Sequence, residues 1–177
     1  MMRNLALFAA AALVCAPQIA AAAEPACLTP REVTAFTAFA LPGVITATAQ
    51  RCSAVLPAGA FLRTSGQQMA QRYAARKSAV WPETKAALIK LSGGSNDQAA
   101  NLFKTLPDET LQQLADTMVT GVVADKIPAS RCGVIDQFLA LLSPLPPENT
   151  AELIGLTMGL VSRGETPKLG KLSICKA

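Results

Sequence analysis

The sequence predicts an all-α protein: a disulfide-stapled bundle of about seven short helices after a cleaved signal peptide. Apolar residues recur at helical spacing, for example at Leu111, Leu114, Met118 and Val122. We expect this stripe to face the core. No segment shows the sustained period-two alternation of a half-buried strand. The 12 prolines and 11 glycines fall at almost every joint between helical segments.

Residues 1–23 have the features of a secretory signal peptide. Arg3 supplies a positive charge, residues 5–14 form a short apolar run, and residues 21–23 are alanines of the kind that a signal peptidase requires. The apolar run is too short to span a bilayer. We therefore expect cleavage after Ala23. The mature chain, residues 24–177, is then a single all-helical domain that is not an integral membrane protein.

Export places the mature chain in the periplasm or outside the cell, and the alanine-rich signal is typical of bacteria. A lipoprotein anchored at Cys15 is the alternative. It is less favoured because Leu13 and Val14 are bulky at positions where a lipoprotein signal has small residues.

The mature chain carries four cysteines, which are expected to form two disulfides in an oxidising compartment. They are Cys27, Cys52, Cys132 and Cys175. Four cysteines allow three connectivities. The preferred pairs are Cys27–Cys52 and Cys132–Cys175, while a pairing of first with last and middle with middle stays open.

The preferred pairing depends on two predicted helical hairpins. Thr29-Pro30-Arg31-Glu32 is a capping box with proline at the first helical position. The helix that it starts is expected to break at Leu41-Pro42-Gly43, and a second helix over residues 44–55 then folds back. If the two segments instead form one kinked helix, Cys27 and Cys52 lie far apart. A second hairpin would bring Cys175 near Cys132.

The remaining predicted helices follow from helix formers, caps and breakers. Pro82 is expected to restart a helix that ends at Gly93. Pro107, Asp108 and Glu109 form the first turn of another, which ends near Lys126. The expected ranges are 58–78, 81–93, 95–104, 107–126, 131–142 and 148–162.

Positive charge gathers in the middle of the chain and predicts a face for an anionic partner, such as an envelope polymer, lipid headgroups or an acidic protein. Its residues are Arg63, Arg72, Arg76, Lys77, Lys85 and Lys90. The alternative is that these side chains complement acidic helices within the fold. A nucleic-acid partner is not expected, because removing Arg3 lowers the net charge from +4 to +3 and aromatic residues are few.

Residues 33–50 contain no charge. A membrane span is not favoured, because four threonines and the Pro42-Gly43 pair interrupt the stretch. A buried helical hairpin is the simpler interpretation, although such a hairpin could instead line an apolar pocket. Trp81 is the only tryptophan; we expect it to pack as a hydrophobic staple rather than to anchor a ligand.

The sequence offers no catalytic residue, no cofactor site and no metal site. It contains no histidine, which removes Ser-His-Asp and Cys-His catalysis and imidazole ligands, and paired cysteines are not nucleophiles. Ser173 and Lys176 have an S-x-x-K spacing without the partner motifs. Glu148 and Glu152, one turn apart at a helix start, are expected to serve the helix dipole.

Four short stretches resemble a group of uncharacterised small exported bacterial proteins that are helical and carry four cysteines. The stretches are Cys27-Leu28-Thr29-Pro30, Leu41-Pro42, Arg51-Cys52 with Leu56-Pro57, and residues 145–150. The resemblance covers most of the mature chain and implies no activity.

These observations favour a non-catalytic exported protein that binds a protein or an envelope component. The first alternative is a carrier whose helical hairpins enclose a small apolar ligand or a lipid. The second is an enzyme that uses carboxylates or lysine, which ranks last because no nucleophile or acid–base pair can be recognised.

Overall fold

The computed structural model describes residues 27–93, 97–163 and 174–175. This part of the chain forms eight α-helices, one 3-10 helix and no strand, apart from an isolated bridge between Leu28 and Ile174. The predicted all-α, disulfide-stapled bundle is confirmed. The predicted signal peptide lies outside the described residues. The elements are α1 (Pro30–Cys52), α2 (Phe61–Thr64), α3 (Gly66–Ala74), α4 (Lys77–Gly93), α5 (Asp97–Thr105), α6 (Asp108–Lys126), η1 (Ala129–Arg131), α7 (Cys132–Leu142) and α8 (Pro147–Arg163).

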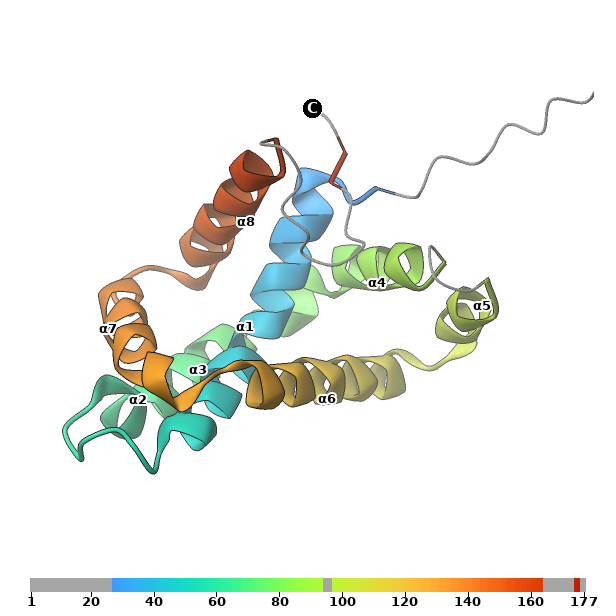
Figure 1. Ribbon diagram of the computed structural model, residues 1–177. Helices are drawn as coiled ribbons and strands as arrows, with labels where there is room; N and C mark the ends of the chain where they lie inside the picture. The colour runs from blue at the N-terminus through green and yellow to red at the C-terminus, as the bar shows by residue number, and fades with distance from the viewer. Residues whose placement is uncertain (1–26, 94–96, 164–173, 176–177) are drawn as a thin grey trace, which may run out of the picture.

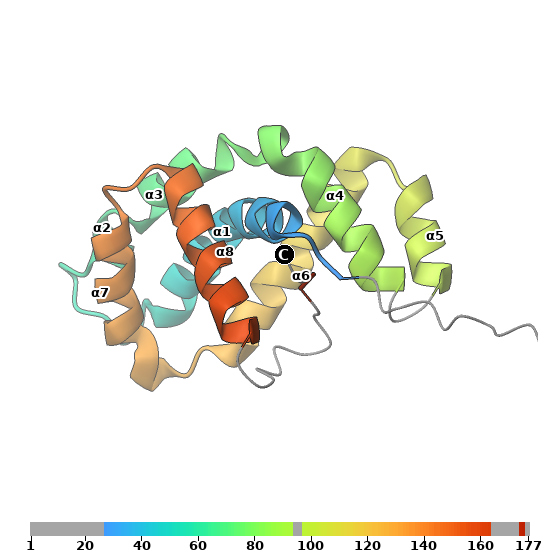
Figure 2. The same cartoon turned by 90° about the horizontal axis from the view of Figure 1, so that it is seen from above.

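Helix α1 runs through the middle of the bundle, and α3, α4, α6 and α8 pack around it (Figures 1 and 2). It begins at the predicted capping box. The Glu32 amide donates to Thr29 Oγ1 at 3.3 Å, and the Thr29 amide donates to Glu32 Oε2 at 2.8 Å. Because no charge occurs between Val33 and Gln50, α1 can be enclosed on several sides without an unpaired charge.

By length and composition, α1 could also cross a membrane. A core helix meets the same criterion, and 56% of the apolar window of α1 is buried inside the bundle. Its contacts with four other helices account for that composition.

The predicted break at Leu41-Pro42-Gly43 is wrong, because α1 continues through Pro42 as one helix. Pro42 has no amide hydrogen for the Ala38 carbonyl, and such a proline costs about 3 kcal/mol. Phe39, Leu41 and Ile45 are all buried. Each large apolar side chain contributes about 1.5–3 kcal/mol on burial. Packing around the proline therefore outweighs its local cost.

The continuous helix changes the disulfide map. A helix of 23 residues is about 35 Å long, so Cys27 and Cys52 lie at opposite ends and the predicted pairs Cys27–Cys52 and Cys132–Cys175 are wrong. Cys27 pairs with Cys175, and Cys52 pairs with Cys132, with Cα–Cα distances of 4.9 and 5.5 Å. One disulfide closes each end of α1.

A second proline also lies inside a helix. Helix α4 begins at Lys77 and passes through Pro82, so the predicted restart there is wrong. The predicted helix 58–78 is divided among α2, α3 and the start of α4. Trp81 is therefore not a staple at a helix start, but it is buried and packs at 5.3 Å from the Phe39 ring centroid, between α4 and α1.

The predicted inward stripe of α6 is only partly correct. Leu111 is buried, but Leu114, Met118 and Val122 are 37%, 56% and 60% exposed. Helix α1 packs on an adjacent side of α6, where Gly43 faces Thr120 and Val119. The predicted end of this helix is correct, because α6 ends at Lys126.

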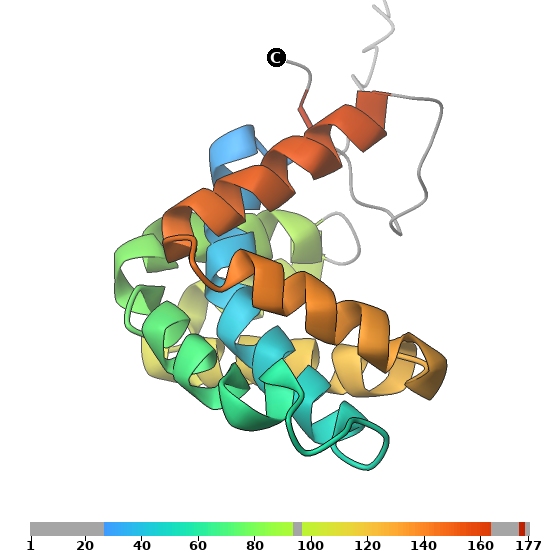
Figure 3. The same cartoon turned by 90° about the vertical axis from the view of Figure 1, so that its left-hand side faces the viewer.

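Helix α8 crosses α1 at Gly155. A Cβ atom there would lie 2.8 Å from Thr34 Oγ1, so the close approach requires glycine or a shift of the threonine side chain. A short turn joins α8 to α7, and both helices cover the face shown in Figure 3.

Replacing Pro42 with alanine is expected to leave the free energy of unfolding unchanged to within about 1 kcal/mol. The substitution restores a helical amide, worth about 3 kcal/mol. Against this stand about 1 kcal/mol from greater freedom of the unfolded chain and about 1.6 kcal/mol for the two methylenes that the buried Pro42 ring loses. Urea unfolding measures the change. A loss of more than about 2 kcal/mol in Pro42→Ala, with no such loss in the loop variant Pro57→Ala, would contradict a continuous α1.

Candidate interaction surface

Five of the six basic residues predicted to form an anionic-partner face are used inside the fold to join α3 and α4 to other elements. Arg72 Nη2 donates to the Ser143 carbonyl at 2.9 Å, and Arg76 pairs with Glu148. Both contacts tie α3 and the residues after it to the α7–α8 segment. The three lysines lie on α4: Lys77 pairs with Asp116, Lys85 with Asp108 at 2.6 Å, and Lys90 with Glu32 at 2.7 Å.

The sixth basic residue, Arg63, closes the loop between α1 and α2. Its Nη1 donates to the carbonyls of Ser53 and Leu56 at 3.3 and 3.0 Å. Every member of the predicted face thus has an intramolecular partner. An anionic ligand would have to displace or share these contacts. The basic side chains thus connect elements within the fold, as the alternative interpretation expects.

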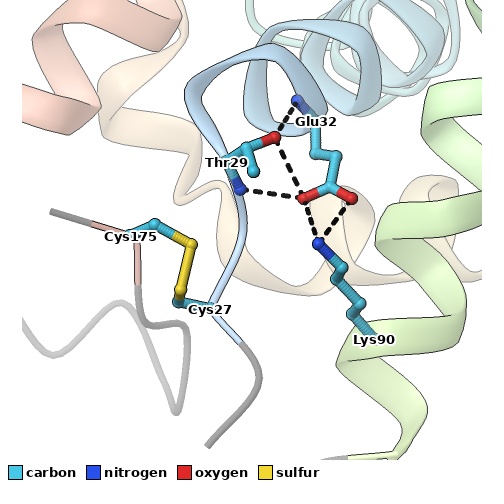
Figure 4. Close-up of a disulfide and its surroundings, with 5 residues drawn as sticks. All are labelled: Cys27, Thr29, Glu32, Lys90 and Cys175. Atoms are coloured by element: carbon cyan, nitrogen blue, oxygen red, sulfur yellow. Dashed lines mark hydrogen bonds and ion pairs between the residues drawn. A yellow bond between two sulfur atoms is a disulfide. The ribbon is translucent and has the colours of Figure 1, made fainter. Parts of the chain in front are cut away.

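Lys90 belongs to a network at the start of α1, beside the Cys27–Cys175 disulfide (Figure 4). Burial of the Glu32 carboxyl raises its pKa. The hydrogen bonds from Lys90 and from the amide and hydroxyl of Thr29 lower it by more, so that the pKa of Glu32 lies below its ordinary value of 4.5. The Lys85 ammonium likewise lowers the pKa of Asp108. The charged Glu32 holds α4 against the capped end of α1.

The α7–α8 segment is fixed to the rest of the bundle by contacts at several points. Asp136 of α7 accepts from the amides of Phe61 and Leu62 at 3.3 and 2.7 Å, so it caps α2 from another helix. The Cys52–Cys132 disulfide joins α7 to α1. In α8, Thr150 shares a buried hydrogen bond of 2.8 Å with Tyr73. The segment is therefore rigidly positioned.

Despite this anchoring, α7 and α8 expose large apolar side chains on the sides opposite their buried residues. On α7 they occur at i, i+4 and i+7, and on α8 at i and i+3, so each set lies on one side of its helix. We call the set the α7–α8 apolar face. Its members are Val134 (63% exposed), Phe138 (53%), Leu141 (75%), Leu153 (46%) and Leu156 (67%).

Sequence reasoning missed both Asp136 and this face. The Asp136 carboxylate accepts hydrogen bonds from amides 74 and 75 residues away, so no local motif could reveal this cap. The spacing of Val134, Phe138 and Leu141 was visible in the sequence. An apolar stripe alone does not show whether it faces the core or solvent, because α7 also buries Leu139 and Leu142.

Glu148 and Glu152, which were expected to serve the helix dipole, lie in the first two turns of α8. Glu148 is bound to Arg76, and Glu152 has no ion pair in the part of the chain that the structure describes. Among residues 27–93, 97–163 and 174–175, no three His, Cys, Asp or Glu side chains lie close enough together to hold a metal ion. Ser173 and Lys176 lie outside the described residues.

Comparisons with known proteins assign no family: no family model matches the chain, and no curated protein and no solved structure matches it significantly. Functional inference therefore rests on the surfaces and clefts of the chain itself.

The Glu32–Lys90 network predicts acid sensitivity of folding. Because the folded-state pKa of Glu32 is depressed, its stabilising contribution is fully present above about pH 4.5 and is lost as the pH falls through the folded-state value. In Glu32→Gln, the loss of unfolding free energy between about pH 5 and pH 3 should be smaller than in the unmodified protein.

Lys90→Gln is the matched variant for this measurement. It should reduce the acid sensitivity only in part, because the Thr29 amide still donates to Glu32. Denaturant titrations at a series of pH values measure both effects. Identical pH profiles for the unmodified protein and Glu32→Gln would exclude the network as the origin of the acid sensitivity.

Proposed function

We propose that this is an exported bacterial protein, periplasmic or secreted, that binds another protein through its α7–α8 apolar face. The observation that carries the proposal is the exposure of five large apolar side chains on two anchored helices. Exposed apolar patches on soluble proteins mark interaction sites, and the exposed apolar side chains of α7 and of α8 each lie on one side of their helix. A docking surface also gains from being rigid, because less conformational freedom is lost on binding.

Two features support export. The two disulfides are compatible with an oxidising compartment such as the periplasm or the exterior. Residues 1–23 have the charge, apolar run and small residues of a cleaved signal peptide. Structure and sequence thus favour the same compartment through independent features.

The charges around the apolar face favour a protein over a membrane surface. Helices that lie on anionic lipid combine apolar side chains with lysine and arginine. From Arg131 to Met158 that arginine is the only basic residue, whereas Asp136, Glu148 and Glu152 are acidic. Arg72 and Arg76 also reach this segment, but they are bound to Ser143 and Glu148. An anionic bilayer would therefore gain little electrostatic attraction here, whereas an apolar patch on a protein fits without a charge requirement.

The two alternatives receive less support. The two clefts described for this structure combine apolar atoms with amide, hydroxyl or charged groups, which does not suit a lipid carrier. An enzyme would require a group that reacts, and the lysine–carboxylate contacts on α4 each join two helices. Protein binding remains the function with a direct structural basis.

Site-specific photocrosslinking in the source cell tests the proposal. A photoreactive side chain at Leu141 or at Leu156 should yield the same crosslinked protein product. The matched control is Leu102 of α5, which is also an exposed leucine, at 54%, but lies outside the face. It should not yield that product.

Phe138→Glu should reduce the product from Leu141 at least about tenfold, since burying an unpaired charge in the interface costs more than about 1.4 kcal/mol. Far-ultraviolet circular dichroism should show an unchanged fold. A product at twice the chain mass would identify the partner as a second copy. Equal products from Leu102 and Leu141, or none from either α7–α8 position, would refute the proposed function.

A further inference from the structure

The two disulfides of the bundle differ in their exposure to solvent. Cys52 and Cys132, which join the end of α1 to the start of α7, are 0% and 1% exposed. Cys27 and Cys175 are both partly exposed, and their disulfide lies just before the first turn of α1. Thiol–disulfide exchange requires that a thiolate reach a sulfur atom. A reductant in solution can therefore attack Cys27–Cys175 directly, whereas it reaches Cys52–Cys132 only after the bundle opens.

The exposed disulfide holds the residue pair Ile174–Cys175, which we call the latch segment, beside Leu28. The Cys175 amide donates to the Leu28 carbonyl at 2.9 Å, and Leu28 and Ile174 form the isolated bridge. Within the described residues, the latch segment has this backbone hydrogen bond and one partly buried apolar side chain besides the disulfide. A single hydrogen bond and a single side chain are weak attachments. The disulfide therefore decides whether the latch segment stays in place.

Ile174 covers part of a small apolar cluster to which α1, α4 and α8 contribute. The buried centre of the cluster consists of Leu28, Val33 and Ala87, which are 1%, 4% and 0% exposed. The partly buried side chains packed against this centre are Phe36, Leu91, Met158 and Ile174. All of these members except Leu28 and Ile174 belong to helices. Displacing Ile174 would therefore open the cluster to solvent on the side that the latch segment covers.

The start of α1 is held by contacts that do not involve the latch segment. The Thr29–Glu32 capping box closes its first turn, and Lys90 of α4 binds the Glu32 carboxylate at 2.7 Å (Figure 4). The other end of α1 is fixed by the buried disulfide to α7. Opening the exposed disulfide is therefore expected to release the latch segment and to leave α1 folded.

We propose that Cys27–Cys175 is a redox latch that a dithiol opens and reoxidation closes, and that the open form exposes the apolar cluster at the start of α1. A thiolate of the dithiol attacks one Sγ atom, the Sγ–Sγ bond breaks, and the other cysteine leaves as a thiolate. The second thiol of the dithiol then displaces the first cysteine. The dithiol becomes a disulfide, and its two protons end on Cys27 and Cys175. This latch is separate from the face to which the proposed function is assigned.

Timed reduction of the disulfide-bonded protein with dithiothreitol, a small dithiol, tests this inference. Iodoacetamide stops the reaction and labels the free thiols, and the remaining cysteines are then reduced in denaturant and labelled with N-ethylmaleimide. Trypsin places the four cysteines in separate peptides, so mass spectrometry gives the rate at each site. Cys27 and Cys175 should react at least about tenfold faster than Cys52 and Cys132. A smaller difference, or earlier labelling of Cys52 and Cys132, would overturn the inference.

The fluorescence of anilinonaphthalene sulfonate, a dye that binds exposed apolar surface, measures the opening. Reduction of Cys27 and Cys175 alone should raise the fluorescence about twofold or more, with an unchanged far-ultraviolet circular dichroism spectrum. The matched control is the double variant Cys27→Ser, Cys175→Ser, which should show the higher fluorescence without reductant and no further rise with it. Unchanged fluorescence in the reduced protein, or loss of its helical signal, would contradict a latch that opens on a folded bundle.

Discussion

The continuity of α1 through Pro42 is the constraint on which the rest of the structure depends. Because the helix does not turn back, its two ends lie about 35 Å apart, and each must be fixed by a different part of the chain. The end near Cys27 is closed by Cys175, and the end at Cys52 is closed by Cys132. The four neighbouring helices then pack around a core element that carries no charge over most of its length.

This arrangement explains why the basic side chains of the bundle form ion pairs between its elements. Because α1 carries no charge from Val33 to Gln50, most ion pairs join the elements around it: Arg76 is bound to Glu148, Lys77 to Asp116 and Lys85 to Asp108. Lys90 is bound to Glu32 in the first turn of α1. Exposed ion pairs are worth little individually, and their main effect is to set which helices are neighbours. The large apolar side chains that remain exposed include the α7–α8 apolar face and Leu114, Met118 and Val122 on one side of α6.

Local features were predictable from the sequence, and features that depend on tertiary contacts were not. The Thr29–Glu32 capping box and the end of α6 before Pro128 follow from neighbouring residues alone. Pro42 and Pro82 have strong helix-breaking character, but burial of their neighbours keeps both inside helices. The preferred cysteine pairing failed for the same reason, since it was inferred from a turn at Pro42, and the pairing of first with last and middle with middle that was left open is the one observed. The cap that Asp136 provides to α2 links residues too distant in sequence for any local pattern.

Disulfide mapping under non-reducing conditions tests the central position of a continuous α1 most directly. Trypsin cleaves after Arg31, Arg51, Arg131 and Lys171, so each of the four cysteines lies in a separate tryptic peptide. Mass spectrometry of the digest should find the Cys27 peptide linked to the Cys175 peptide and the Cys52 peptide linked to the Cys132 peptide. A link between the Cys27 and Cys52 peptides would require α1 to fold back on itself and would contradict this account.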